Sequence, residues 1–177
     1  MMKIFLAIVL IFLTSCTLQD MQTLNPQTDL EVNKISVAAD LDLEITTGQT
    51  IYVPIYSHIY FEDQDRFIYL SATLSIRNTD LTNKIIITTV DYYDSDGKLV
   101  KQYLTQPLQL APLATTDFVV ARTDKTGGSG ANFIVEWVAE TKVTEPVVES
   151  VMISAASTQG ISFLSPGRVI KTKSNDN

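Results

Sequence analysis

The sequence predicts an all-β fold, an antiparallel immunoglobulin-like β-sandwich of about seven to nine strands. Segments rich in β-branched and aromatic residues follow one another at short intervals, and Gly, Pro, Asn and Asp separate them. No long stretch has the period of 3.6 residues that an amphipathic helix requires. The spacing alone does not separate an immunoglobulin-like sandwich from another small sandwich or barrel.

Eight segments have the composition or the alternation of strands. They are 51–60, 68–77, 85–93, 99–104, 115–122, 131–139, 147–155 and 161–170. The clearest is 68–77, in which every second residue is apolar, so that one face of the strand is expected to be buried. Asp96-Gly97 favours a tight hairpin turn after 85–93, because glycine accepts a positive φ.

Composition and charge exclude several functional classes. The chain has 177 residues, of which 45% are hydrophobic and 19% charged, as in one ordinary folded domain. Its formal net charge of −7 argues against a nucleic-acid partner, because phosphate binding requires clustered Lys and Arg. The single Cys excludes an intramolecular disulfide and multi-cysteine metal clusters, and the single His excludes a His-rich metal site. We expect no cofactor.

The first fifteen residues are typical of a secretory signal peptide. A basic start is followed by ten uninterrupted apolar residues, 4–13, whereas a membrane-spanning helix needs about 20. The run ends in Leu-Thr-Ser-Cys at 13–16, which resembles the lipobox of bacterial lipoproteins. That resemblance implies that the Cys16 sulfur carries a diacylglyceryl group, that residues 1–15 are removed, and that membrane lipid holds the chain. Each buried CH₂ of an acyl chain contributes about 0.8 kcal/mol to such anchoring.

The chain therefore divides into four predicted parts. They are a signal peptide at 1–15, a lipid-anchored polar tether at 16–48, a sandwich at 49–170 and a disordered tail at 171–177. Thr17 follows the cysteine in place of the Asp that retains lipoproteins in the inner membrane of enteric-type bacteria. The resemblance thus implies a place in the bacterial cell envelope, on the outer membrane and facing the periplasm.

Six short segments within the predicted sandwich have a distinctive order and spacing. They are 51–58 (IYVPIYSH), 71–80 (SATLSIRNTD), 90–99 (VDYYDSDGKL), 108–114 (LQLAPLA), 127–133 (GGSGANF) and 160–163 (GISF). In these segments the chain resembles a bacterial family catalogued as a domain of unknown function (number 3124), from about Ile51 to Ile170. The resemblance implies a periplasmic β-sandwich lipoprotein and no particular activity.

A row of tyrosines is the strongest candidate binding surface. Tyr52, Tyr56 and Tyr60 recur at every fourth residue, so on one strand they share a face with His58. On the outer face of an edge strand these residues form a binding surface, whereas facing inward they are simply core. Arg77 and Asn78 end the next predicted strand and are candidates for carboxylate recognition, with a surface ion pair as the alternative.

His58 also suggests an alternative function, a small-ligand or metal sensor. Three acidic residues follow it at 62, 63 and 65, and together they offer the ligand types of a divalent metal site. A strand-end His followed by a solvated acidic loop is the simpler explanation, because one imidazole with acids on a flexible loop rarely makes a tight site.

A glycine-rich segment at 127–131 (GGSGA) superficially resembles the nucleophile elbow of hydrolases, with Ser129 as the nucleophile. That elbow needs a parallel sheet, a following helix and a downstream His, none of which the sequence predicts. A flexible turn between strands is the simpler explanation, with Asn132 as a candidate cap or binding residue. The leading hypothesis is therefore a non-enzymatic binding module of the cell envelope, whose partner is an envelope protein or peptide.

Overall fold

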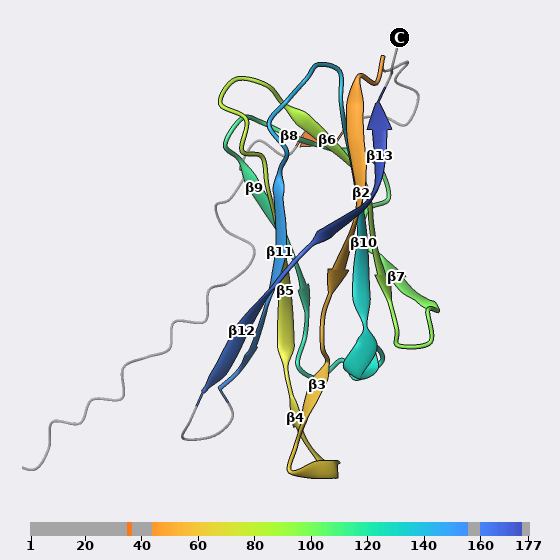
Figure 1. The fold of residues 1–177 in the computed structure, drawn as a ribbon, viewed down its shortest axis with the longest axis vertical. Coiled ribbons are helices and arrows are strands. Elements are labelled where there is room, and N and C mark those ends of the chain that lie inside the picture. Colours follow the sequence, from red (N-terminus) through yellow and green to blue (C-terminus); the bar gives the residue numbers. More distant parts are fainter. Residues whose placement is uncertain (1–34, 37–43, 156–159, 175–177) are drawn as a thin grey trace, which may run out of the picture. The chain divides into compact units, whose positions relative to one another are not determined.

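The computed structural model describes residues 35–36, 44–155 and 160–174, all within one compact unit that spans Glu31–Asn177. The predicted signal peptide, Cys16 and most of the predicted tether lie outside these residues. The described ranges form thirteen strands, and every strand pairing among them is antiparallel (Figure 1). The predicted all-β antiparallel sandwich is confirmed. In these ranges no helix has the length and hydropathy to cross a membrane.

Seven strands form the larger sheet. They are β1 (Ile35–Ser36), β2 (Thr47–Pro54), β6 (Ile85–Tyr93), β7 (Leu99–Gln102), β8 (Leu108–Leu110), β10 (Asn132–Ala139) and β13 (Arg168–Ser174). Their spatial order is β1-β8-β6-β10-β2-β13, and β7 pairs with β6 off this path. The turn before β7 is the predicted one, with Gly97 at a φ of 76°.

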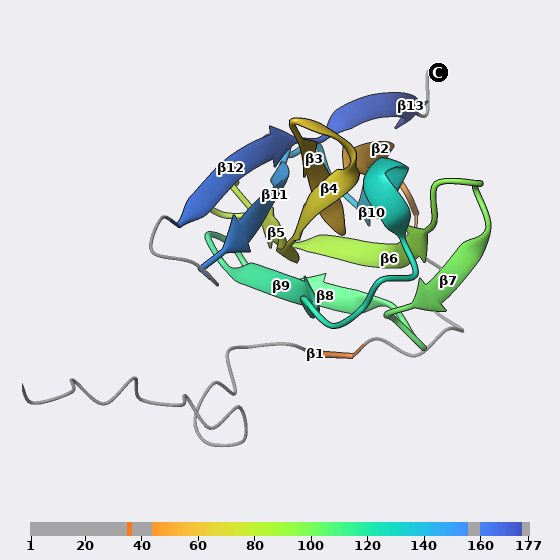
Figure 2. The same cartoon turned by 90° about the horizontal axis from the view of Figure 1, so that it is seen from below.

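Four strands form the second sheet, which packs over the first. They are β5 (Ser71–Arg77), β9 (Thr115–Val120), β11 (Val147–Ser154) and β12 (Ile161–Pro166), in the order β12-β11-β5-β9. Figure 2 shows the two sheets as layers on either side of the core. The predicted inner face of β5 is confirmed, because Ala72, Leu74 and Ile76 are buried while Ser and Thr occupy the alternate positions. Trp137 and Phe133 of β10 fill the space between the sheets.

A separate two-stranded hairpin follows β2. It consists of β3 (His58–Phe61) and β4 (Asp63–Tyr69), which pair only with each other among the described residues. The predicted single strand 51–60 is therefore wrong, because the chain bends at 55–57 after Pro54, which has no N–H to donate. Two backbone hydrogen bonds hold the bend, from the Ile55 N–H to the Ala131 carbonyl and from the Ser57 N–H to the Gly128 carbonyl, both 2.9 Å.

Other boundaries also differ from the prediction. The segment 161–170 divides at Gly167, where the chain leaves β12 in one sheet and enters β13 in the other. The predicted disordered tail is wrong for 171–174, because β13 continues to Ser174 along the edge of β2. Polar side chains suit such an edge strand, and Lys173 Nζ lies 3.6 Å from the Glu136 carboxylate. At the other end, β1 and the start of β2 fall inside the predicted tether.

Candidate functional site

One face of the β3–β4 hairpin carries four aromatic side chains, and we call this face the aromatic hairpin. Its members are His58 and Tyr60 of β3 and Phe67 and Tyr69 of β4. His58 pairs with Tyr69 across the ladder, and Tyr60 pairs with Phe67, so all four point to the same side. The ring centroids are 5.1 Å apart for His58 and Tyr60, 5.3 Å for His58 and Phe67, and 5.0 Å for Phe67 and Tyr69.

These rings stay accessible because the opposite face of the hairpin is the one that packs on the protein. Ile59 and Ile68 alternate with the rings and pack against the hydrophobic core. Tyr60 keeps 51% of its surface exposed and Phe67 keeps 41%. Single exposed apolar residues are ordinary, but a contiguous aromatic cluster on a surface is typical of an interaction site.

The tip of the hairpin is acidic. Glu62, at a φ of 65°, forms the turn, and Asp63 and Asp65 follow it. Arg66 pairs with Glu62, and its Nε lies 3.8 Å from the Asp63 carboxylate. Three carboxylates against one guanidinium leave the tip negative. An open hollow of about 300 Å³ joins the acidic and aromatic groups, and its lining is Tyr60, Phe61, Glu62, Asp63 and Gln64.

A lysine from another part of the chain lies over one of the rings. Lys125 Nζ is 4.4 Å from the centroid of the Tyr69 ring, within the range of a cation–π contact. Lys125 belongs to the loop between β9 and the single 3-10 turn η2 (Gly128–Gly130). The Ser57–Gly128 hydrogen bond attaches this loop beside the start of β3. The face of Tyr69 thus already holds an ammonium group of the same chain.

The three tyrosines of the predicted row lie in different elements of the fold. Ile51, Val53 and Ile55 are buried, so the row faces away from the core, the outward of the two orientations that the sequence left open. However, β2 lies between β10 and β13 and is not an edge strand. Tyr56 sits in the bend, with its ring centroid 5.9 Å from that of Phe163 in an edge-to-face contact. Among the three tyrosines, Tyr60 belongs to the aromatic hairpin and Tyr52 remains on β2.

Arg77 and Asn132 lie on different sheets and away from each other in the topology. Arg77, at the end of β5, has Nη2 3.9 Å from the Glu149 carboxylate and donates from Nε to Ser75 Oγ at 3.1 Å. The contact with Glu149 is a surface ion pair, which was the alternative to recognition of a ligand carboxylate by Arg77. Asn132 is the first residue of β10 and stands opposite Pro54 on β2 and Tyr93 on β6.

His58 and Ser129, the residues of the metal and hydrolase alternatives, lie in β3 and in η2. Within the described ranges, no three His, Cys, Asp or Glu residues are grouped so that they could hold a metal ion. His58 instead lies among rings, with Tyr69 6.3 Å away between centroids. Ser129 lies in η2, which leads directly into the antiparallel strand β10, whereas the nucleophile elbow requires a strand followed by a helix.

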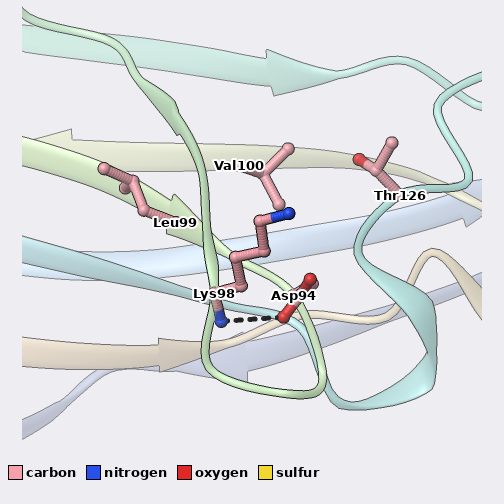
Figure 3. A pocket seen from close by; sticks show the side chains of 5 residues that line it. All are labelled: Asp94, Lys98, Leu99, Val100 and Thr126. Atoms are coloured by element: carbon pink, nitrogen blue, oxygen red, sulfur yellow. Dashed lines mark hydrogen bonds between the residues drawn. The ribbon is translucent and has the colours of Figure 1, made fainter.

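A second hollow, of about 490 Å³, lies beside the β6–β7 turn, and Figure 3 shows its lining. The lining residues are Asp94, Lys98, Leu99, Val100 and Thr126. Asp94 Oδ1 accepts hydrogen bonds from the backbone N–H groups of Lys98 at 2.8 Å and Asp96 at 3.0 Å. Because this carboxylate closes the turn, we assign it a structural role.

Asn78, predicted beside Arg77 to recognise a carboxylate, is instead buried together with Asp80. Asn78 Nδ2 donates to the carbonyls of Asn83 at 2.8 Å and Ala111 at 3.0 Å. Asp80 accepts from the backbone N–H groups of Thr144 at 2.9 Å and Asn83 at 2.7 Å. These N–H groups, with Thr144 foremost, hold the pKa of Asp80 well below its ordinary value. The pair ties the β5–β6 loop to the loop before β11, which is a structural function.

Phe67 and Tyr69 were also missed, although a signal for them exists. The residues His-Ile-Tyr-Phe at 58–61 and Phe-Ile-Tyr at 67–69 are nearly symmetric about the polar stretch 62–66. Two short aromatic segments around a polar centre are the pattern of a β-hairpin. Applied to this stretch, that pattern predicts a hairpin, and the observed register, which pairs Tyr60 with Phe67 and shifts between Tyr60 and Phe61, then brings the four rings to one face.

Comparison with known proteins gives a family and no activity. Residues 48–170 match the family described as "Protein of unknown function (DUF3124)", over more than half of the chain. The chain belongs to this family. The DUF3124 match begins in β2 and ends in β13, so it includes the aromatic hairpin. The crystal structure of Thermotoga maritima 1070 is similar at 10% identity and a TM-score of 0.41, over 68% of this chain and 92% of that chain. No curated protein matches.

Proposed function

We propose that this DUF3124 protein is a lipid-anchored, non-enzymatic binding module of the bacterial cell envelope. The Leu-Thr-Ser-Cys sequence at 13–16 supports the anchor at Cys16, which would hold the sandwich at the outer membrane on its periplasmic side. The observation that carries the binding role is the aromatic hairpin. Its partner is an envelope protein or peptide.

The geometry favours a binding surface over a purely structural one. The inner face of the hairpin is already occupied by Ile59 and Ile68, so burial of the four rings is not needed to attach the hairpin to the core. Figure 1 shows β3 and β4 at one end of the sandwich, and Tyr60 and Phe67 on these strands are exposed. Exposed Tyr and Phe supply large contact areas at interfaces at a low entropic cost.

Site-directed crosslinking in cells tests this proposal. The full-length chain is expressed with a photoreactive residue on the hairpin, as Tyr60→p-benzoylphenylalanine. The matched control is Leu164→p-benzoylphenylalanine, at a residue of β12 that is 54% exposed on the other sheet. We expect one reproducible crosslinked species from position 60 and none from position 164. Equal labelling at both positions, or none at either, would contradict the proposal.

A further inference from the structure

The rings of the aromatic hairpin stand at steep angles to one another. The planes of His58 and Tyr60 meet at 87°, and those of Phe67 and Tyr69 meet at 73°. A flat ligand such as a sugar ring stacks best on a level aromatic platform, which these angles do not provide. A cation requires only one accessible ring face within about 6 Å of its charge, and the exposed side chains of Tyr60 and Phe67 can each offer one.

The charge around the rings also favours a cation. The hairpin tip carries three carboxylates, at 62, 63 and 65, against the single guanidinium of Arg66. The whole chain has a formal net charge of −7. A basic partner is attracted to this end of the molecule, whereas an anionic lipid surface or an acidic protein is repelled.

Lys125 shows what kind of group the rings accept. Its ammonium lies 4.4 Å from the Tyr69 centroid, and its side chain is exposed on a loop. A contact of this kind at an exposed site is weak, about 0.5–1 kcal/mol, so a partner that supplies several cations can replace it. Lys125 therefore occupies a position that an external ammonium or guanidinium group can take.

From this geometry and charge we infer that the aromatic hairpin binds a Lys- or Arg-bearing polypeptide segment. The cationic side chains of that segment displace Lys125 from the Tyr69 ring and approach the acids of the hairpin tip. This inference rests on the proposed function, because it names the chemistry of the partner for the same surface.

A synthetic peptide tests the chemistry directly. Fluorescein-labelled decalysine is titrated with the full-length lipidated protein in neutral detergent, and binding is followed by fluorescence anisotropy. We expect saturable binding that weakens as salt is added, and no binding of labelled decaglutamate. Equal binding of the two peptides, or binding of neither, would overturn the inference. Binding of soluble glycerophosphocholine, which has the headgroup without acyl chains, in the absence of decalysine binding would assign the surface to a lipid headgroup and also overturn the inference.

Variants locate the bound peptide on the hairpin. Tyr60→Ala combined with Phe67→Ala removes two ring faces, and we expect about a tenfold loss of decalysine affinity. Leu164→Ala is the matched control, an exposed apolar residue on β12, and should bind as the wild type does. Asp63→Asn with Asp65→Asn keeps the shape of the tip and should weaken binding as well. Unchanged affinity in both hairpin variants, with circular dichroism showing a folded protein, would contradict the assignment.

Substitution of Lys125 should strengthen decalysine binding, whereas the hairpin substitutions should weaken it. Lys125→Met removes the internal competitor, so we expect decalysine to bind about threefold more tightly. Lys142→Met makes the same charge change in the exposed loop between β10 and β11, and should have little effect. An equal gain in both variants would mean that net charge alone is responsible, and displacement of Lys125 would be ruled out.

The two proposals can fail separately. If position 60 crosslinks a partner in cells while decalysine does not bind, the binding role stands and the basic chemistry is wrong. If decalysine binds but no partner crosslinks at position 60, the surface has the inferred chemistry and the proposed role in the envelope is wrong.

Discussion

The backbone N–H of Gly167 donates a 2.9 Å hydrogen bond to the carbonyl oxygen of Val148, and this bond fixes the point where the chain crosses between the sheets. A Cβ at position 167 would lie 2.6 Å from Ile51 Cγ2 and 2.7 Å from that same carbonyl oxygen. Ile51 is buried, so neither neighbour can move aside without disturbing the packing.

We expect Gly167→Ala to lower the free energy of unfolding by about 1–3 kcal/mol, because the added methyl group overpacks the crossing. Urea denaturation followed by circular dichroism measures the change. Gly160→Ala is the matched control, since the nearest non-neighbouring atom of the described residues would lie 3.8 Å from a Cβ there. Equal free energies of unfolding for Gly167→Ala and Gly160→Ala would show that the backbone around position 167 can move to accommodate a methyl group.

Asp80 should make the stability of the sandwich sensitive to acid. Hydrogen bonds from backbone N–H groups, that of Thr144 foremost, lower its folded-state pKa below the ordinary value of 3.8. A lowered folded pKa means that the stabilisation is fully present above about pH 4 and is lost as the pH falls through the folded value. We expect the melting temperature of Asp80→Asn to be lower at pH 7 and to approach that of the wild type at acid pH. Equal melting temperatures of Asp80→Asn and the wild type at pH 7 would contradict this expectation.

Ionised Asp91 should destabilise the fold at neutral pH, whereas ionised Asp80 stabilises it. Burial raises its pKa above the ordinary value, a hydrogen bond with Gln102 opposes the rise, and the charge of Glu136 adds to it. Because the folded pKa is raised, ionisation of Asp91 destabilises the fold once the pH exceeds the unfolded value. We expect Asp91→Asn to raise the melting temperature at pH 7 and to lose this advantage below pH 4, as scanning calorimetry at the two pH values would reveal. A lower melting temperature at pH 7 would contradict the expected sign.

The anchor is tested by changing the one cysteine. In Cys16→Ser the sulfur that would carry the lipid is gone, so we expect the protein to leave the membrane fraction and to incorporate no labelled palmitate. Thr17→Ser alters the adjacent residue while keeping the thiol, and should remain membrane-bound. If Cys16→Ser stays with the membrane, lipid attachment at this residue is not what holds the chain there.

The alternation in 68–77 predicted the buried face of β5 because a strand with one solvated face leaves a period of two in the sequence. A similar alternation in 51–60 gave no indication of the bend at 55–57. Ile55, Ser57 and Ile59 keep their parity through the bend, so a broken strand and a continuous one give the same pattern. Bends of this kind depend on hydrogen bonds to distant residues, here Gly128 and Ala131, which local sequence does not reveal.

The candidate site was predicted only on one strand. Tyr60 and His58 were named because they share parity along 51–60. Their partners Phe67 and Tyr69 come from the facing strand, and cross-strand neighbours are known only once the register is fixed. The contact of Lys125 with Tyr69 depends on loop placement, which has no local sequence signal.

The position of β2 has a consequence for how this chain acquires its structure. Both neighbours of β2 in the sheet, β10 and β13, are encoded far downstream of it. Pairing across such separations must close large loops before any stabilisation is gained, and refolding on the order of milliseconds to seconds is typical of such β topologies. If the chain is exported as proposed above, the edge of β2 that pairs with β13 would stay unpaired until residues 168–174 had crossed the membrane. Slow self-assembly of this kind would favour transport of the polypeptide in an unfolded state.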